Sequence, residues 1–172
     1  MKREQTPSQT VGPFFASGLT AEQYGYFFTQ IADGVIVSSD SSIRIEGAVF
    51  DGEGKTVPDA MVEIWQTGVG FGRQGTGTAP GNSFRFETEK PKSFSATEAP
   101  HLTVILFMRG LLSHLYTRIY FDDEPVANAA DEVFSSLPSE RRATLLARKN
   151  GPSRYRFDIH LQGPTETVFF DL

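Results

Sequence analysis

The chain has 172 residues, enough for one domain with a substantial core, and its net charge of −5 argues against non-specific binding of nucleic acid. The absence of cysteine excludes disulfide bonds and thiolate metal sites. There is no run of about 20 apolar residues to predict a membrane span, and polar residues follow Met1-Lys2-Arg3 where a secretion signal would be apolar, so we expect a cytoplasmic protein.

Residues 1–40 predict an extended N-terminal arm and an irregular segment. Pro7 and Pro13 restrict the backbone, and residues 4–15 have neither helical nor alternating periodicity. The arm ends in Phe14-Phe15, two rings that are costly to leave in water. Two interpretations remain open: the rings fold back onto their own domain, or the arm packs on a partner chain.

Residues 41–172 predict a single β-rich domain. Alternation of apolar and polar residues indicates strands at 42–50, 61–66, 83–88, 114–121 and 155–162, and a last strand is expected at 167–170. The most apolar run, 99–110, predicts a strand buried on both faces. The stretch 68–81 is rich in glycine and threonine and predicts a loop.

Helical patterns occur late in the chain. They cover 129–135 and a segment that begins at Pro138 and ends near Arg148-Lys149. No alternation of strands with helices supports a parallel sheet. We therefore predict an all-β protein, a β-sandwich of seven to eight short strands with a small helical insertion before the last strands.

Several separated stretches carry a resemblance to a known family. Residues 6–15, 57–66, 99–102 and 155–159 look like motifs of the intradiol ring-cleavage dioxygenases. Residues 107–121, 162–163 and 166–171 are most similar to the alpha chains of those members that pair an alpha chain with a beta chain. The resemblance runs through nearly the whole chain.

The resemblance implies a β-sandwich and a reaction at ferric iron. In the iron-bearing chains of this family, two tyrosinates and two histidines hold a non-haem Fe(III), which a catechol chelates before O₂ opens its ring. The two histidines form a His-x-His pair on one strand. Here His101 is present, but Thr103 stands at the second position, and Phe94 is the nearest aromatic residue before them. The segment 67–71 contains no tyrosine.

With one ligand of four remaining, we expect no metal and no complete catalytic site in this chain. The resemblance implies that Fe(III) belongs to a partner beta chain in a hetero-oligomer and that the substrates are protocatechuate and O₂. The segment Gln66 to Phe71 is also shorter than expected for the family. Either this loop is deleted or a segment is missing.

The same resemblance assigns pocket-lining roles to Gly12, Pro13, Phe14 and Arg109. Arg109 would attract the carboxylate of an aromatic acid in the partner's cavity, while the arm residues would form its wall. The plainer readings are a surface ion pair for Arg109 and simple subunit contacts for the arm. A functional alternative also remains: an inert β-sandwich module of the same family that binds a ligand or partner without chemistry.

Overall fold

The computed structural model describes residues 7–12, 14–27, 29–77 and 79–171. The strands are β1 (Ser42–Phe50), β2 (Met61–Gln66), β3 (Gly70–Gly75), β4 (Ser83–Glu89), β5 (His101–Phe107), β6 (Leu115–Phe121), β7 (Leu146–Gly151), β8 (Arg154–Arg156) and β9 (Ile159–His160). The α-helices are α1 (Phe15–Leu19), α2 (Pro125–Ala130), α3 (Glu132–Ser136) and α4 (Ser139–Arg142). Two short 3₁₀ helices are η1 (Ala21–Tyr24) and η2 (Ala143–Leu145).

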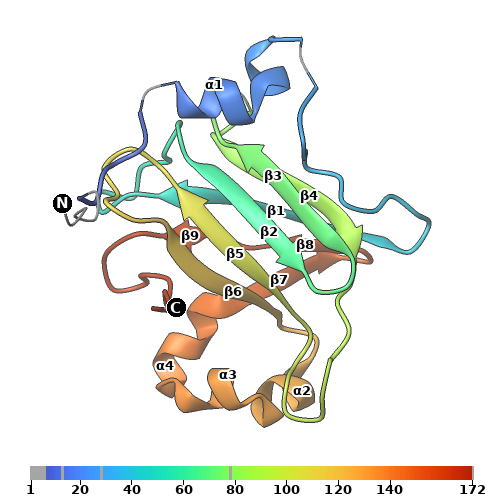
Figure 1. Ribbon diagram of the computed structural model, residues 1–172. Coiled ribbons are helices and arrows are strands. Elements are labelled where there is room, and N and C mark those ends of the chain that lie inside the picture. The colour runs from blue at the N-terminus through green and yellow to red at the C-terminus, as the bar shows by residue number, and fades with distance from the viewer. Residues whose placement is uncertain (1–6, 13, 28, 78, 172) are drawn as a thin grey trace, which may run out of the picture.

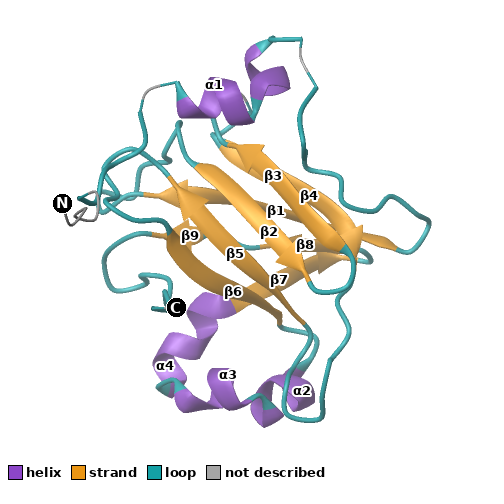
Figure 2. Cartoon of the chain, in the orientation of Figure 1, coloured by secondary structure: helices purple, strands orange, loops and turns teal. Residues whose placement is uncertain are grey.

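The strands form two layers that are joined at one edge (Figures 1 and 2). Their order is β3-β2-β5-β6-β7-β8-β1-β4, and β9 pairs with β1. Strand β7 makes the join, because it pairs with β6 at Leu146 and Ala147 and then with β8 from Arg148 onward. Small helices precede the last strands, and the predicted β-sandwich is confirmed.

The core lies between the two layers and follows from the period of two in the sequence. Side chains of alternate residues point to one face of a strand, so β4, β5 and the first half of β1 bury every second residue. Ile43 and Ile45 of β1 and Phe84 and Phe86 of β4 are buried in this way. One contiguous cluster joins these residues to the inner side chains of the opposite layer, including Ile64 of β2.

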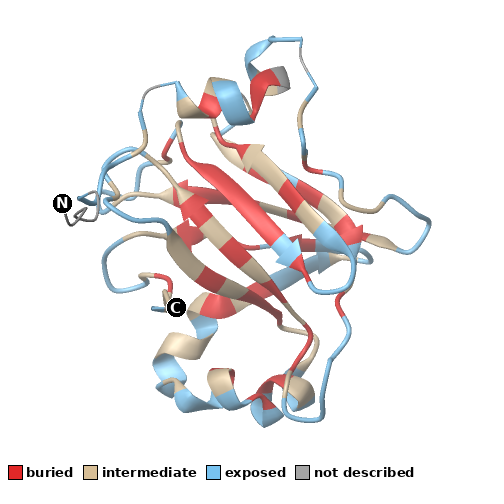
Figure 3. Cartoon of the chain, in the orientation of Figure 1, coloured by how far each residue is buried: buried red, intermediate tan, exposed pale blue. Residues whose placement is uncertain are grey.

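Strand β5 alternates as well, which corrects the prediction that both of its faces are buried. Leu102, Val104 and Leu106 are fully buried in the core, whereas Ile105 and Phe107 are half-buried on the outer face (Figure 3). The helices gather at two ends of the sandwich and leave this outer face between them (Figure 1). The unbroken apolar run of β5 therefore contributes one face to the core and the other face to the outer surface of the sandwich.

Three other predicted elements were wrong. The stretch 68–81 contains strand β3, which pairs with β2 along its whole length, from Gln66↔Gly70 to Met61↔Gly75. The basic end of the predicted last helix is strand β7 instead, because the helical segment ends with η2 at Leu145. The expected strand at 167–170 is a single bridge between Tyr116 and Phe170.

A segment before β1 closes the gap between the outer edges of β3 and β4. Arg73 N of β3 donates to Asp33 O at 2.7 Å, and Glu87 N of β4 donates to Gly34 O at 2.7 Å. Gly34 is buried, and a Cβ at this position would overlap Arg85 O. Glycine thus permits the close approach that satisfies both strand edges.

Candidate functional site

Arg109 lies just past β5, where the chain turns toward β6. The antiparallel register pairs Met61 with Phe107, so the segment before β2 lies beside the segment after β5. Asp59, two residues before β2, accepts a hydrogen bond from Arg109 Nε and forms an ion pair with it. The Arg109 side chain is 59% exposed, so much of the guanidinium faces solvent.

The N-terminal arm reaches the same turn. Thr10 Oγ1 accepts a hydrogen bond from Gly110 N at 2.8 Å. Gly110 has a φ of +94°, a conformation that favours glycine, and this sets the direction of the chain directly after Arg109. The structure thus brings the arm and Arg109 together, two parts of the sequence that are 100 residues apart.

Two of the three predicted arm residues are described, and both are exposed. Gly12 O accepts a hydrogen bond from Phe15 N at 3.2 Å, in the turn that leads into α1. The side chain of Phe14 is 81% exposed and does not pack on the core of its own chain. Pro13 lies outside the described residues. Their assignment to a substrate pocket stays a prediction.

His101 opens β5 on the outer face of the sheet. Its Nδ1 lies 3.0 Å from Ala99 O, and its Nε2 lies 3.7 Å from Glu98 Oε1. Burial lowers the pKa of His101, and the nearby Arg118 charge adds to the shift, although the Ala99 and Glu98 oxygens oppose it. The imidazole is therefore neutral at pH 7, and its proximity to Glu98 is not an ion pair there.

A buried aspartate holds the start of β5 in place. Asp131, the N-cap of α3, accepts from Phe134 N at 2.7 Å and from Ala99 N at 2.9 Å. The Tyr120 hydroxyl also donates to it, at 3.1 Å. The helical insertion thus fixes the backbone that carries His101. The sequence contained no motif for this link, because it joins residues 32 positions apart.

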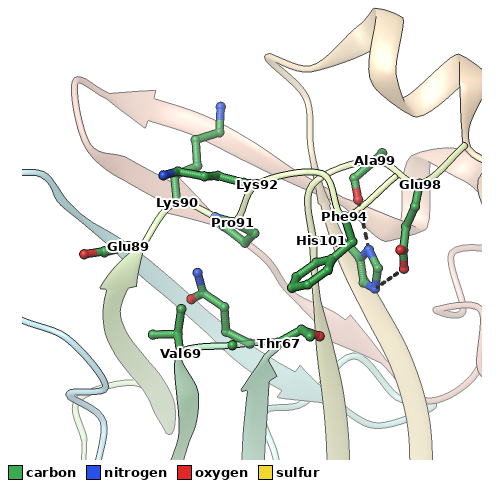
Figure 4. Close-up of a pocket in the computed structure, with 12 residues that line it drawn as sticks. Thr67, Val69, Glu89, Lys90, Pro91, Lys92, Phe94, Glu98, Ala99 and His101 are labelled. Carbon is green, nitrogen blue, oxygen red and sulfur yellow. Dashed lines mark hydrogen bonds and ion pairs between the residues drawn. The ribbon is translucent and has the colours of Figure 1, made fainter. Parts of the chain in front are cut away.

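His101 borders a pocket of about 260 Å³ at one end of the sheet. Lys90, Lys92 and Phe94 come from the segment after β4, and Thr67 and Val69 from the turn between β2 and β3 (Figure 4). The Phe94 side chain is 66% exposed. The pocket mixes hydrocarbon with charges of both signs, since Glu89 and Glu98 also line it.

The donors around His101, which include the Glu98 carboxylate, are too few to hold ferric iron. Thr103, two residues along the same face of β5, offers a neutral hydroxyl, and Phe94 offers no oxygen atom. Ferric iron favours several hard, anionic oxygen donors. Among the residues that the structure describes, no three His, Asp or Glu side chains come close enough together to hold a metal ion.

A charged cluster beside this pocket ties four segments together. Asp123 accepts hydrogen bonds from Lys90 Nζ, Lys149 Nζ and the Tyr155 hydroxyl, each at 2.9 Å. Burial of this carboxyl would raise its pKa, but the three donors outweigh burial and lower the pKa of Asp123 to about 2. Lys90 also bonds Glu124 Oε1 at 2.6 Å, and its pKa is raised because these partners outweigh its own burial.

Trp65 presents a ring on the outer face of β2. It is 43% exposed and stacks on Phe71 of β3 with centroids 4.3 Å apart. Its indole Nε1 donates to Glu63 Oε2 at 3.2 Å, and the Glu63 carboxylate pairs with Arg73 at 2.6 Å. The structure thus places Trp65 outside the core, on the exposed face of β2.

None of the helices among the described residues has the length and apolar character needed to cross a lipid bilayer. A scan against protein-family models finds no match.

Curated relatives match the chain over nearly its full length. It is 46% identical to the protocatechuate 3,4-dioxygenase alpha chain of Burkholderia cepacia, over 98% of both chains. It is 36% identical to the alpha chain of Pseudomonas putida, over 97% of this chain and 96% of that one. The first alignment spans 193 positions, more than the 172 residues here, so the relative contains residues that this chain lacks.

Two more distant relatives, one compared by sequence and one by structure, are also dioxygenases. The beta chain from Burkholderia cepacia is 29% identical over 73% of this chain and 66% of its own length. Among solved structures, a dioxygenase domain from Streptomyces sp. SirexAA-E superposes with a TM-score of 0.60 at 23% identity and covers 95% of this chain and 100% of that one. That superposition shows a shared fold. On the sequence identity and the fold together, the chain belongs to the protocatechuate 3,4-dioxygenase alpha chains, within the intradiol ring-cleavage dioxygenases.

Proposed function

We propose that this chain completes the substrate pocket of an iron-bearing beta chain in an alpha–beta hetero-oligomer. The enzyme adds O₂ to protocatechuate and yields 3-carboxy-cis,cis-muconate, with both oxygen atoms retained in the product. The observation that carries the proposal is the 46% identity with an alpha chain of that enzyme across 98% of both chains. The enzyme works in the cytoplasm, a reducing compartment that suits a chain without cysteine.

The ferric iron belongs to the beta chain in this proposal. The support is chemical: around His101 the described residues offer one neutral imidazole and the Glu98 carboxylate, which are too few donors for Fe(III), and no tyrosine lines the pocket. When bound to the partner, the iron activates the catechol ring for cleavage. The residues of this chain then bind and orient the substrate and exclude water.

The guanidinium of Arg109 is the group that would hold the substrate carboxylate. It is exposed at the end of β5, and its planar fork matches a carboxylate in shape and charge. Gly12, Pro13 and Phe14 belong to the adjoining arm and would form the apolar wall of the same pocket. The contact of Thr10 with Gly110 supports this grouping, because it anchors the arm directly beside Arg109.

Residues 1–40 would pack on the partner, while residues 41–172 form the sandwich. The support is the exposure of large apolar side chains in this part of the chain: Phe14 is 81% exposed, Tyr26 54%, Phe27 100% and Ile31 86%. Such a concentration of exposed rings is costly in water and is typical of a surface that is covered in the assembly.

Co-expression with an iron-bearing beta chain tests the proposal. The chain alone should be colourless and inactive, and the purified complex should show the tyrosinate-to-iron absorption band and open protocatechuate. If the two chains do not co-elute and the beta chain alone is equally active, the inert-module alternative is correct. A beta chain mixed with a different β-sandwich protein serves as the control.

A further inference from the structure

Asp59 faces Arg109 across the ends of two neighbouring strands. Met61 pairs with Phe107 in the antiparallel register, and Asp59 and Arg109 each lie two residues beyond that pair. The backbone therefore brings their side chains together before any side-chain interaction acts. The carboxylate then accepts a hydrogen bond from Arg109 Nε.

Asp59 is the more buried half of this pair. Its side chain is 25% exposed, against 59% for Arg109. Tyr24 lies near it: burial is the main cause of the raised pKa of Tyr24, and the charge of Asp59 adds to it. The turn after Arg109 is held by Thr10, which accepts from Gly110 N at 2.8 Å. Arg109 is thus restrained through its side chain and through the backbone that follows it.

The atom at which Asp59 contacts the guanidinium of Arg109 decides which N–H donors remain for a ligand. A guanidinium carries five N–H donors, and Asp59 takes the one on Nε. The terminal amino groups can then donate side by side to the two oxygens of another carboxylate. An arginine that is already oriented loses less side-chain freedom when the ligand binds.

We infer that Asp59 is a positioning residue, which holds the guanidinium of Arg109 in the orientation that receives the carboxylate of the aromatic substrate. This inference rests on the proposed function, since it concerns the same pocket. The pair is an exposed one, and such pairs contribute little to folding stability. The effect of Asp59 is therefore expected in substrate binding and not in the melting temperature.

Anaerobic titration of the complex with the beta chain measures this directly, because substrate binds without being consumed. Asp59→Ala should raise the dissociation constant of protocatechuate about three- to tenfold, the cost of ordering one long side chain. Catechol, which lacks the carboxylate, should bind as it does to the original complex. In air, KM should rise while kcat stays nearly constant.

Two variants separate orientation from charge. Asp59→Asn removes the charge but keeps an oxygen that can accept from Nε, so it should retain most of the affinity that Asp59→Ala loses. Glu46→Ala breaks another exposed arginine–carboxylate pair, with Arg85 at 3.0 Å, and should change nothing. Equal losses in the Asn and Ala variants would show a charge effect and overturn the inference.

The remaining outcomes are also decisive. If Arg109→Ala weakens protocatechuate binding while Asp59→Ala leaves it unchanged or tighter, Asp59 does not position Arg109 and the proposed function stands. If Arg109→Ala has no effect, the proposed role of Arg109 itself is wrong. Asp59→Ser replaces the Ala variant if that variant fails to assemble with the beta chain, and failure of both would show a structural role and overturn the inference.

Discussion

At the scale of single residues, Arg109 stands out as a charged group just past the end of β5. An exposed arginine needs no special explanation, but this one adjoins the N-terminal arm through Gly110 and Thr10. Its Nε is bonded to Asp59, so its terminal amino groups can donate to another acceptor. The residue is therefore suited to binding an anion and not to holding a metal.

We expect Arg109→Ala to raise KM for protocatechuate roughly 10- to 100-fold, because a hydrogen-bonded charged partner contributes about 1.5–3 kcal/mol. Steady-state kinetics of the complex measure this, and metal analysis should find the iron content unchanged. Arg85→Ala, a substitution of another exposed arginine, is the matched control. Loss of iron from the Arg109 variant would mean that Arg109 has a structural role.

His101 predicts a dependence of stability on pH. Its pKa in the folded chain is lowered, chiefly by burial, so below about pH 6.5 the unfolded chain binds a proton that the folded chain resists. The stability that the neutral His101 imidazole contributes is therefore present above about pH 6.5 and is lost as the pH falls below it. When the pH is lowered from 7.5 to 5.5, the melting temperature of the His101→Gln variant should fall by less than that of the unsubstituted chain.

The exposed His114 provides the comparison for that measurement. His114→Gln controls for the replacement of an exposed histidine elsewhere in the chain. If His101→Gln and the unsubstituted chain lose equal stability on acidification, the imidazole of His101 is not held in its neutral form by the fold.

The candidate site around Arg109 could be predicted from the sequence only in part. Arg109 and the arm were identified by resemblance to a family, and the structure places them side by side. The role of Asp59 was missed, because nothing in its neighbours indicated a partner 50 residues away. Only the register of β2 against β5 shows that link, and register is a property of the paired strands and not of either one.

At the scale of elements, alternation predicted most of the strands but not β3 or β7. Gly70 to Gly75 has no β-branched residue and three glycines, so local propensity favours a loop. Pairing with β2 and cover from the segment around Gly34 nevertheless make it a strand. Strand β7 follows a genuine helical turn without an intervening glycine or proline, so its start carried no sequence signal.

Asp123 connects several of these elements and predicts a measurable loss of stability. Its pKa is lowered from 3.8 to about 2 by three donors that outweigh burial, which corresponds to roughly 2 kcal/mol at neutral pH. This stability is present above the unfolded pKa and is lost as the pH falls from about 5 toward 2. Asp123→Asn should lower the free energy of unfolding in urea by that amount at pH 7.

The control for Asp123 is Glu53→Gln, which breaks an ion pair with Lys55 whose side chains are both about three-quarters exposed. This variant should unfold at the same urea concentration as the original chain. An Asp123 variant that behaves like the Glu53 variant would mean that the cluster of Lys90, Lys149 and Tyr155 does not join the segments energetically.

At the scale of the whole molecule, the chain has a well-packed core, but part of its surface exposes large apolar side chains. Apolar side chains of both layers form one buried cluster, as in an independently folded domain. By contrast, the segment 14–31 exposes several large apolar side chains, and the outer face of β2 exposes Trp65. Exposed apolar side chains of this kind are typical of a surface that a partner covers.

Iron analysis tests this account most directly. The chain should be expressed alone in iron-supplemented medium, expressed with the beta chain, and purified in the same way both times. We predict no bound iron in the chain alone, one iron for each beta chain in the complex, and ring cleavage only in the complex. Tightly bound iron in the chain purified without its partner would contradict the account.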